Sequence, residues 1–406
     1  MLPPNFFIFY IGEFGFVVSQ SIQITRGGYK LEDMSNAILA WSLVFAMSIF
    51  TSILSWNISN VIEAAAAQKQ GNSTSVHANN NTNLTNEGVS LLILGKYNEA
   101  ISLFDKVLAV EPNSILALTN KATALVYLQK YNEAITLFDK ALAREPNNTG
   151  ILDSKGNALV SLHKYNEAIT LFDEALTREP NNVYSLSLKG ISLAGLHKYN
   201  EAITLFDKAL TIDPSNLQTL TNKGNALDNL GKHQEAIQYY DKALAIEPNH
   251  IVALEDKGSA LDLLGKYNEA IVYYDKALTL DPMNVDLLYN KAVALGKLGD
   301  HAQAIQYYDQ ALAIEPNYTG ALTGKGFALH QLANNNQAIV YYDKALAIDP
   351  SNADTLTNKA LALAALHRYD ESIKYYDKAL SIEPNLQYAI IGKRLSLEAL
   401  NQTQIK

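Results

Sequence analysis

The stretch KYNEAITLFDKAL occupies residues 130–142, and the same thirteen residues return at 198–210. Residues 164–176 repeat it with one change, Glu174 in place of a lysine. Nine of the 11 prolines in this chain of 406 residues lie 34 residues apart: Pro112, Pro146, Pro180, Pro214, Pro248, Pro282, Pro316, Pro350 and Pro384. Self-similarity at a fixed period is typical of a repeat architecture. The sequence therefore predicts nine repeats over residues 81–386.

Each repeat contains two helical patterns. In the second repeat, apolar residues from Leu118 to Leu128 recur at three- or four-residue spacing, and a second such series begins at Ala134. Asn132 and Glu133 are typical of a helix start, through capping and the helix dipole. Pro146 and the asparagines after it predict the end of the second helix, and an asparagine there is suited to cap the next one.

Two columns of small residues run through the repeats, one in each helix. A glycine inside a helix costs about 1 kcal/mol relative to alanine, so a recurring one needs a structural reason. The first column holds Gly88, Ala122, Gly156, Gly190, Gly224, Gly258, Ala292, Gly326 and Ala360. The second holds alanine, except for Ser372, and an aromatic residue follows four positions later in every repeat. We expect the helices of a pair to approach closely at the small residues, with the aromatic rings beside them.

The 34-residue period, small residue, alanine, aromatic residue and proline together resemble the tetratricopeptide repeat. One departure is uniform: leucine occupies the slot where the family often has tryptophan in the first helix. The resemblance implies an all-α fold in which helix-turn-helix repeats stack into a right-handed superhelical solenoid with a concave inner face. A repeat of this kind cannot bury its apolar face alone, so each repeat packs against its neighbour. We expect residues 387–406 to form a C-terminal helix that caps the stack with a solubilising face.

Two charged columns predict contacts between neighbouring repeats. An aspartate recurs in the second helix of all nine repeats, and a lysine recurs in the first helix of repeats two to nine and again at Lys393. The first repeat has no predecessor and holds Glu87 in the lysine slot. We expect each aspartate to pair with the lysine of the next repeat, as Asp105 with Lys121. The alternative is a solvated stripe, since exposed ion pairs contribute only about 0–1 kcal/mol each.

The residues before the repeats differ from them in composition and do not follow the 34-residue period. Within residues 1–67, positions 37–54 (AILAWSLVFAMSIFTSIL) are apolar, and about 20 such residues are enough to cross a bilayer as a helix. This pattern favours an N-terminal hydrophobic helix that anchors the chain in a membrane. Arg26 and Lys30 precede it, which places the repeats on the extracytoplasmic side. Cleavage as a signal peptide near Ala64–Ala67, giving a secreted protein, is the alternative. Residues 68–80 are polar and predict a flexible linker.

Composition and motifs give no sign of catalysis, a cofactor or a metal site. There is no cysteine, and His163, His197 and His367 share a turn slot with glycines. No arrangement of nucleophile and base is visible. The net charge of −9 argues against a nucleic-acid partner. We therefore expect a non-enzymatic protein.

The family resemblance favours a membrane-tethered scaffold that binds a peptide or an extended segment of a partner protein on its concave face. One alternative is a structural spacer of the envelope that has no specific ligand. Another is an accessory subunit of a glycosyltransferase-type or secretion assembly, because asparagines such as Asn86, Asn120 and Asn222 form part of an inner ladder.

By the same resemblance, the outer slots of the first helices line the concave face. In repeats one to four they are largely apolar: Val89, Leu92, Val126, Tyr127, Tyr184, Leu188 and Ile191. In repeats five to seven they are acidic: Asp228, Glu255, Asp256, Asp262 and Asp286. This change predicts a groove for a partner segment with apolar side chains at one end and basic ones at the other. The alternative is a solvated face, partly neutralised by lysines such as Lys297.

Overall fold

The computed structural model describes residues 76–404, and this part of the chain consists of nineteen α-helices, nine consecutive pairs and a final helix, without strands. The chain divides into two compact units, Met1–Lys164 and Tyr165–Lys406. The boundary falls between the two helices of the third repeat. The apolar stretch at 37–54 lies outside the described residues. No helix in the described part is long and apolar enough to cross a membrane.

The first unit contains five described helices: α3 (Val76–Ile93), α4 (Tyr97–Val110), α5 (Ile115–Tyr127), α6 (Tyr131–Leu142) and α7 (Thr149–Ser161). Because α3 begins at Val76, residues 76–80 of the predicted linker are helical.

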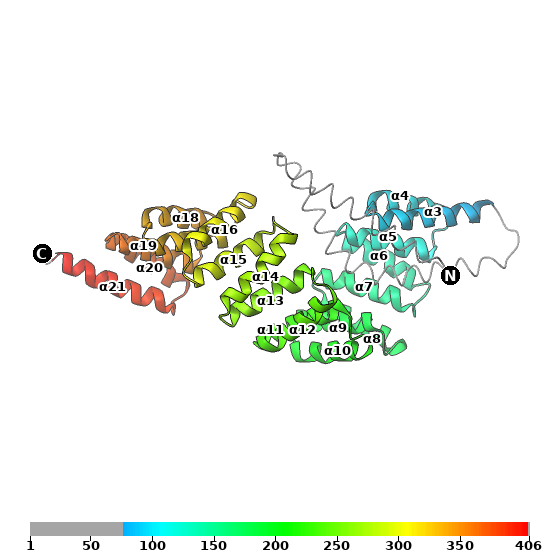
Figure 1. The fold of residues 1–406 in the computed structure, drawn as a ribbon. Helices are drawn as coiled ribbons and strands as arrows, with labels where there is room; N and C mark the ends of the chain where they lie inside the picture. The colour runs from blue at the N-terminus through cyan, green and yellow to red at the C-terminus, as the bar shows by residue number, and fades with distance from the viewer. Residues whose placement is uncertain (1–75, 405–406) are drawn as a thin grey trace. The chain divides into compact units, whose positions relative to one another are not determined.

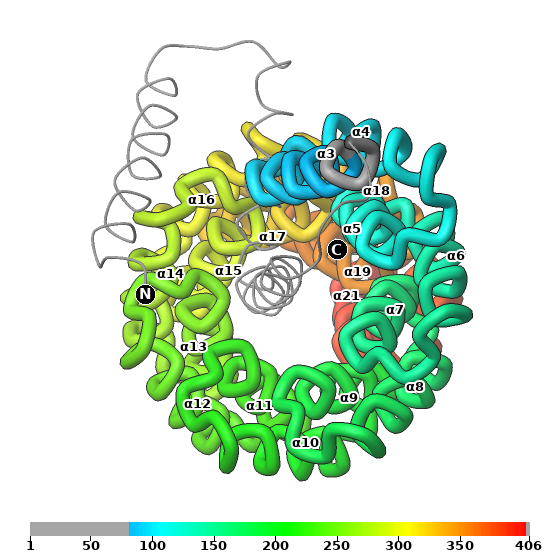
Figure 2. The backbone as a smooth tube through the Cα atoms, turned by 90° about the vertical axis from the view of Figure 1, so that its right-hand side faces the viewer, coloured from blue at the N-terminus to red at the C-terminus, as the bar shows by residue number. Residues whose placement is uncertain are grey.

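The second unit contains fourteen described helices: α8 (Tyr165–Arg178), α9 (Val183–Gly195), α10 (Tyr199–Ile212), α11 (Leu217–Asn229), α12 (His233–Ile246), α13 (Ile251–Leu263), α14 (Tyr267–Leu280), α15 (Val285–Lys297), α16 (His301–Ile314), α17 (Thr319–Gln331), α18 (Asn335–Ile348), α19 (Ala353–Ala365), α20 (Tyr369–Ile382) and α21 (Gln387–Gln404). Within this unit each helix packs against the next one along the chain (Figure 1). Figure 2 shows that α9, α11, α13 and α15 lie on the inner side of the curve, whereas α10, α12, α14 and α16 lie outside. The first helices of these repeats therefore form the concave face.

The small residues act as the sequence predicts. An ideal Cβ on Gly190 would lie 2.5 Å from Cε1 of Phe206, so the ring rests directly on the backbone of α9. The aromatic residue of this column is buried in all nine repeats, and so is the alanine or serine of the second helix. Because this core lies between the two helices of a repeat and between neighbouring repeats, the inner face is free to vary.

Asparagines cap five of the described first helices, as predicted. The side chain of Asn148 accepts a hydrogen bond from the Ile151 amide at 3.2 Å, and Asn182, Asn216, Asn284 and Asn352 cap in the same way.

The predicted cap at the start of the second helix is wrong. Helix α6 begins at Tyr131, its N-cap residue is Lys130, and no side chain caps it. The physical reason is the tight turn before it, in which the Lys130 amide donates to the carbonyl of Leu125 and Gln129 adopts a positive φ of 58°. This closing pattern is that of a Schellman motif, and it leaves Asn132 inside the first turn of the helix.

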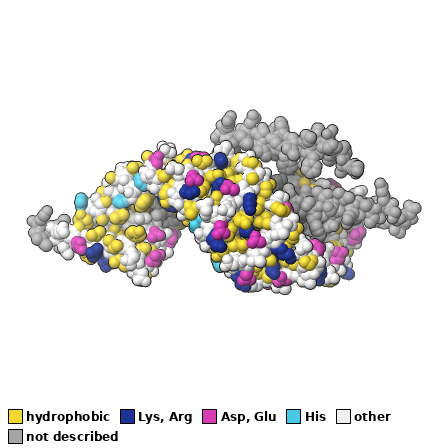
Figure 3. Space-filling view, turned by 60° about the horizontal axis from the view of Figure 1, so that its bottom comes forward, with side chains coloured by type: hydrophobic (Ala, Val, Ile, Leu, Met, Phe, Trp, Pro, Cys, Tyr) yellow, Lys and Arg dark blue, Asp and Glu magenta, His cyan; other side chains and the backbone are white. Residues whose placement is uncertain are grey.

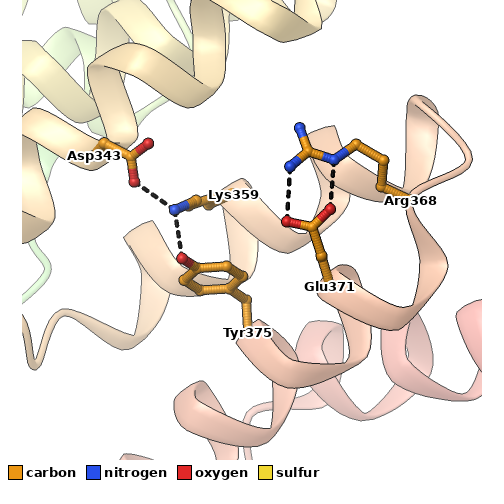
Figure 4. Close-up of polar contacts among 5 residues, drawn as sticks. All are labelled: Asp343, Lys359, Arg368, Glu371 and Tyr375. Atoms are coloured by element: carbon orange, nitrogen blue, oxygen red, sulfur yellow. Dashed lines mark hydrogen bonds and ion pairs between the residues drawn. The ribbon is translucent and has the colours of Figure 1, made fainter.

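The predicted ladder of ion pairs is confirmed. Each aspartate pairs with the lysine sixteen residues later, in the next repeat: Asp105–Lys121, Asp139–Lys155, Asp173–Lys189, Asp207–Lys223, Asp241–Lys257, Asp275–Lys291, Asp309–Lys325, Asp343–Lys359 and Asp377–Lys393. In repeats five to nine a tyrosine joins the pair. Lys359 Nζ, for example, donates to the Tyr375 hydroxyl at 2.6 Å, beside the paired hydrogen bonds of Arg368 and Glu371 (Figure 4).

The C-terminal helix α21 differs from the expected solubilising cap. It packs against α20, and Ala389 and Ser396 are buried. Its other side leaves five large side chains exposed: Tyr388, Ile390, Ile391, Leu395 and Leu397. The expectation of a polar outer face is therefore wrong, because the apolar pattern of a first helix continues through α21 although no described second helix follows to cover it.

Candidate functional site

The five acidic residues expected on the concave face come from three consecutive first helices of the second unit. Asp228 lies near the end of α11, Asp286 near the start of α15, and α13 between them carries Glu255, Asp256 and Asp262. Each of these helices contacts the next first helix, so the carboxylates converge across neighbouring repeats. The structure therefore brings this part of the predicted site together.

Asp256 is the most perturbed of these carboxylates. Its Oδ2 is buried and accepts no hydrogen bond within the described part of the chain. The pKa of Asp256 is raised to about 7, chiefly by burial. The hydrogen bond from Asn225 lowers it, and the negative charges of Glu255 and Asp228 raise it. Asn225 in turn accepts a hydrogen bond of 2.6 Å from the Tyr240 hydroxyl. The carboxylate is thus held in place by a polar chain that reaches the repeat core.

Glu255 shares this environment. Burial raises its pKa to about 6, followed by the negative charges of Asp286 and Asp281. Two adjacent carboxyl groups whose pKa values rise towards neutrality lack sufficient positive charge around them. A cation that binds beside such a pair would stabilise the ionised carboxylates.

The other three acids have partners. Asp228 Oδ1 lies 2.5 Å from Nδ1 of His233, and Asp262 Oδ2 lies 2.5 Å from Lys297 Nζ. Asp286 is exposed and accepts a hydrogen bond of 3.1 Å from the Tyr318 hydroxyl. Three lysines were expected to neutralise this face, and each has another partner: Lys297 pairs with Asp262, and Lys257 and Lys291 pair with aspartates of the ladder.

Four of the seven predicted apolar residues lie in the first unit. Leu92 is buried, and Val89 and Val126 are partly buried against the core. The ring of Tyr127 stacks on that of Tyr97, with 4.9 Å between centroids. Tyr127 also has a pKa above its ordinary value, because of burial and then the neighbouring Tyr97. Leu92 therefore belongs to the core rather than to an accessible groove.

Three of the predicted apolar residues lie in the second unit. Leu188 is buried, whereas Tyr184 and Ile191 are partly buried. The expectation that Leu92 and Leu188 line an open groove is therefore wrong, because both side chains are buried.

Sequence reasoning missed an apolar row further along the second unit. Phe327 on α17, Leu361 on α19 and Leu395 on α21 are exposed and occupy one slot of successive first helices. The signal was available, because these positions follow Val89 and Ile191 in the same 34-residue register. Within the described residues no group of three or more histidine or acidic side chains is placed to hold a metal ion.

Comparison with known proteins agrees with this architecture. Models of the tetratricopeptide repeat match residues 218–250, 285–318 and 353–386, and related repeat models match 154–217, 258–299 and 319–352. A model of subunit 3 of the anaphase-promoting complex, or cyclosome, matches residues 93–175. No curated protein matches the sequence significantly.

Among solved structures, the APC/C hetero-tetramer Cut9-Hcn1 is 20% identical with a TM-score of 0.54, over 74% of this chain and 59% of that chain. The present chain thus spans about three fifths of that chain's length, and the similarity concerns the fold. YrrB, a TPR protein with an unusual peptide-binding site, is 26% identical over 47% of this chain and 97% of that chain, with a TM-score of 0.40. A tetratricopeptide repeat protein from Parabacteroides merdae is 18% identical over 62% and 99%, with a TM-score of 0.48.

Proposed function

This chain belongs to the tetratricopeptide repeat family, and from that premise we propose that it is a non-enzymatic scaffold that binds an extended segment of a partner protein. Proteins built from these repeats generally bind other proteins or peptides rather than catalyse reactions. The right-handed superhelix implied by the family is part of the same proposal, and a crystal structure of the repeats would test its handedness.

The proposed site is the inner face of α11, α13 and α15, and its ligand is a segment that carries lysine or arginine. One observation supports this choice above the others: Glu255 and Asp256, consecutive in α13, both have raised pKa values, and no positive charge contributes to either shift. A basic side chain placed there would stabilise both carboxylates in their ionised form. Burial strengthens such a contact, because the local dielectric constant is lower than in water.

The exposed apolar row that begins at Phe327 indicates a further feature of the proposed ligand, an apolar residue. Phe327 and Leu361 are exposed on α17 and α19, which follow α15 in the stack. A bound segment would place its basic residues over α13 and an apolar residue over this row. Opposite charges would then fix the register and raise the association rate, whereas apolar contact would contribute to affinity.

The test is a binding measurement with paired peptides. Peptides with two lysines flanked by apolar residues are compared with acetyl-lysine versions, by fluorescence anisotropy on the full chain. We expect binding of the basic peptides only, about tenfold weaker for the Glu255→Gln, Asp256→Asn double variant. Glu269→Gln, on the outer helix α14, is the matched control and is expected to bind as the parent does. If lysine and acetyl-lysine peptides bind equally well, or if the double variant binds as tightly as Glu269→Gln, the proposed site is contradicted. Such a result would favour a structural spacer without a specific ligand.

The proposal also includes a membrane tether. It rests on the apolar residues 37–54 and on Arg26 and Lys30 before them, which lie outside the described residues. The domains are then the N-terminal region 1–67, the linker 68–80, whose last residues 76–80 belong to α3, the repeats 81–386 and the C-terminal helix 387–406. Membrane fractionation is expected to retain the chain, and protease added to intact cells is expected to digest the repeats. A soluble product that begins near Gln68 would show signal cleavage instead.

A further inference from the structure

The open side of α21 presents slots that are buried in the repeats before it. In repeats two to nine, the leucine at the first of these slots is 1–3% exposed and the leucine at the second is 1–6% exposed. The equivalent residues of α21, Ile390 and Leu397, are each 40% exposed. The difference arises because the second helix that covers these slots in each repeat has no counterpart after α21 in the described chain.

The exposed apolar surface of α21 is larger than these two residues. Tyr388, Ile391 and Leu395 are also exposed. Hydrophobic side chains are visible on the surface of the molecule among polar ones (Figure 3). From typical side-chain areas, the five residues present roughly 500 Å² of apolar surface, near the upper end for a patch on a monomeric protein. A surface of this size on a terminal helix indicates an interface.

A second helix of the repeat type does not fit this surface. In repeats one to nine the first helix carries glycine or alanine at the point of closest approach. In α21 that slot holds Arg394, whose guanidinium lies 3.9 Å from the carboxylate of Glu398 one turn later. The covering element must therefore pair with an arginine and a glutamate, and it must place apolar residues on both sides of them.

We propose that α21 is a self-association surface, and that the element that covers it is α21 of a second copy of this chain. An antiparallel pair about a twofold axis near residue 396 sets Arg394 level with the partner's Glu398, and Glu398 level with the partner's Arg394. The same axis sets Leu395 beside the partner's Leu395 and Leu397 beside the partner's Leu397. The two charge pairs lie between two apolar edges, so the surface is complementary to itself.

The buried area sets the strength of this dimer. Two copies would bury about 1,000 Å² of apolar surface together, at the lower limit of stable protein interfaces. The expected affinity is therefore micromolar, and the dimer forms where the chain is concentrated. Binding of a partner on the inner face of α11, α13 and α15 does not require it, so the two proposals fail separately.

Sedimentation equilibrium of the full chain, at fixed detergent if needed, tests the proposal. The parent is expected to dimerise, and Arg394→Glu or Glu398→Arg alone is expected to weaken the dimer by at least about tenfold, through two like-charge contacts. Mixing the two variants is expected to restore dimers, because each charge then meets its opposite. The N-terminal segment is the same in every sample, so it cannot produce this pattern.

A second measurement covers the possibility that a charge reversal disturbs α21. The natural chain has no cysteine, so Leu395→Cys introduces a single thiol. A short bismaleimide is expected to join two such chains efficiently, whereas Lys406→Cys, at the end of the chain, is expected to cross-link less. A parent that stays monomeric up to about 100 µM, or variants that dimerise as the parent does, would overturn the proposal.

Discussion

Lys257 Nζ donates a hydrogen bond of 2.6 Å to the hydroxyl of Tyr273, and the same nitrogen pairs with Asp241 of the preceding repeat. In repeats two to four, leucine replaces this tyrosine: Leu137, Leu171 and Leu205. The lysine side chain is 20–22% exposed in those repeats and only 7–9% exposed in repeats five to nine. With tyrosine in place of leucine, the ion pair becomes a contact of three groups in which the lysine is buried and the aspartate stays exposed.

Tyr273→Phe is expected to lower the free energy of unfolding by about 1 kcal/mol, because a buried ammonium loses one acceptor. The ring itself stays over Lys257, whose Nζ lies 4.1 Å from its centroid, so the cation–π contact is retained. Urea unfolding of the repeats measures the change. Leu205→Tyr, which supplies the missing hydroxyl to Lys189, is the reverse variant and is expected to stabilise. An unchanged free energy of unfolding in Tyr273→Phe, with no gain in Leu205→Tyr, would show that the hydroxyl contributes nothing.

The ion pair itself is expected to matter more where the tyrosine covers it. A double-mutant cycle with Asp241→Asn and Lys257→Met is expected to give a coupling energy of about 1–2 kcal/mol. The same cycle on Asp139 and Lys155, where the lysine is more exposed, is expected to give about 0.5 kcal/mol or less. Equal coupling energies at the two sites would contradict this dependence on burial.

The sequence alone predicts those parts of the fold that depend on fixed sequence separation. The lysine lies sixteen residues after its aspartate in every repeat, so a single pairing rule gives all nine ion pairs. The packing of Phe206 on Gly190 follows in the same way, because the aromatic residue lies at a fixed sequence separation from the small residue in every repeat.

Features that depend on tertiary packing were not predictable in this way. The raised pKa of Asp256 arises from burial together with charges on two helices, α11 and α13. Leu188 occupies a slot that the repeat pattern assigns to the concave face, yet its own environment buries it. The cap predicted at Asn132 is wrong because a backbone turn closes the preceding helix and makes Lys130 the N-cap residue of α6.

The turn between the two helices of a repeat offers a stability test. Gln129 has φ of 58°, a left-handed conformation, and Gly231 occupies the same slot with φ of 74°. A residue other than glycine in this conformation is strained by roughly 1–2 kcal/mol. Replacing it by glycine removes the strain but raises the conformational entropy of the unfolded chain, which offsets part of the gain. Gln129→Gly is therefore expected to raise the free energy of unfolding by about 0.5 kcal/mol. The reverse change, Gly231→Gln, is expected to lower it. Calorimetry measures both changes, and a less stable Gln129→Gly together with a more stable Gly231→Gln would rule out this explanation.

The carboxyl groups of α13 predict an unusual dependence of stability on pH. The ordinary pKa values of Asp256 and Glu255 are 3.8 and 4.5, and the folded protein raises them to about 7 and about 6. Between about pH 4 and pH 7 the folded protein therefore holds protons that the unfolded chain has released. Under these conditions the free energy of unfolding falls as pH rises, which is opposite to the behaviour of carboxylates paired with cations.

Asp256→Asn removes the larger of these two contributions and keeps the shape of the side chain. At pH 8 the variant is expected to be more stable than the parent by on the order of 2 kcal/mol, because the parent must then bury an ionised carboxylate. At pH 4 the two proteins are expected to be nearly equal, since the parent's carboxyl group is protonated in the folded state. Urea unfolding at pH 4, 6 and 8 measures the difference, with the exposed Glu269→Gln on α14 as the control. A basic ligand on the inner face would act in the opposite direction, because it binds the ionised carboxylates. Its affinity is therefore expected to rise through the same pH range in the parent and to stay level in Asp256→Asn with Glu255→Gln. A variant whose stability follows that of the parent at every pH would show that Asp256 is ionised in the folded protein and already balanced by its surroundings.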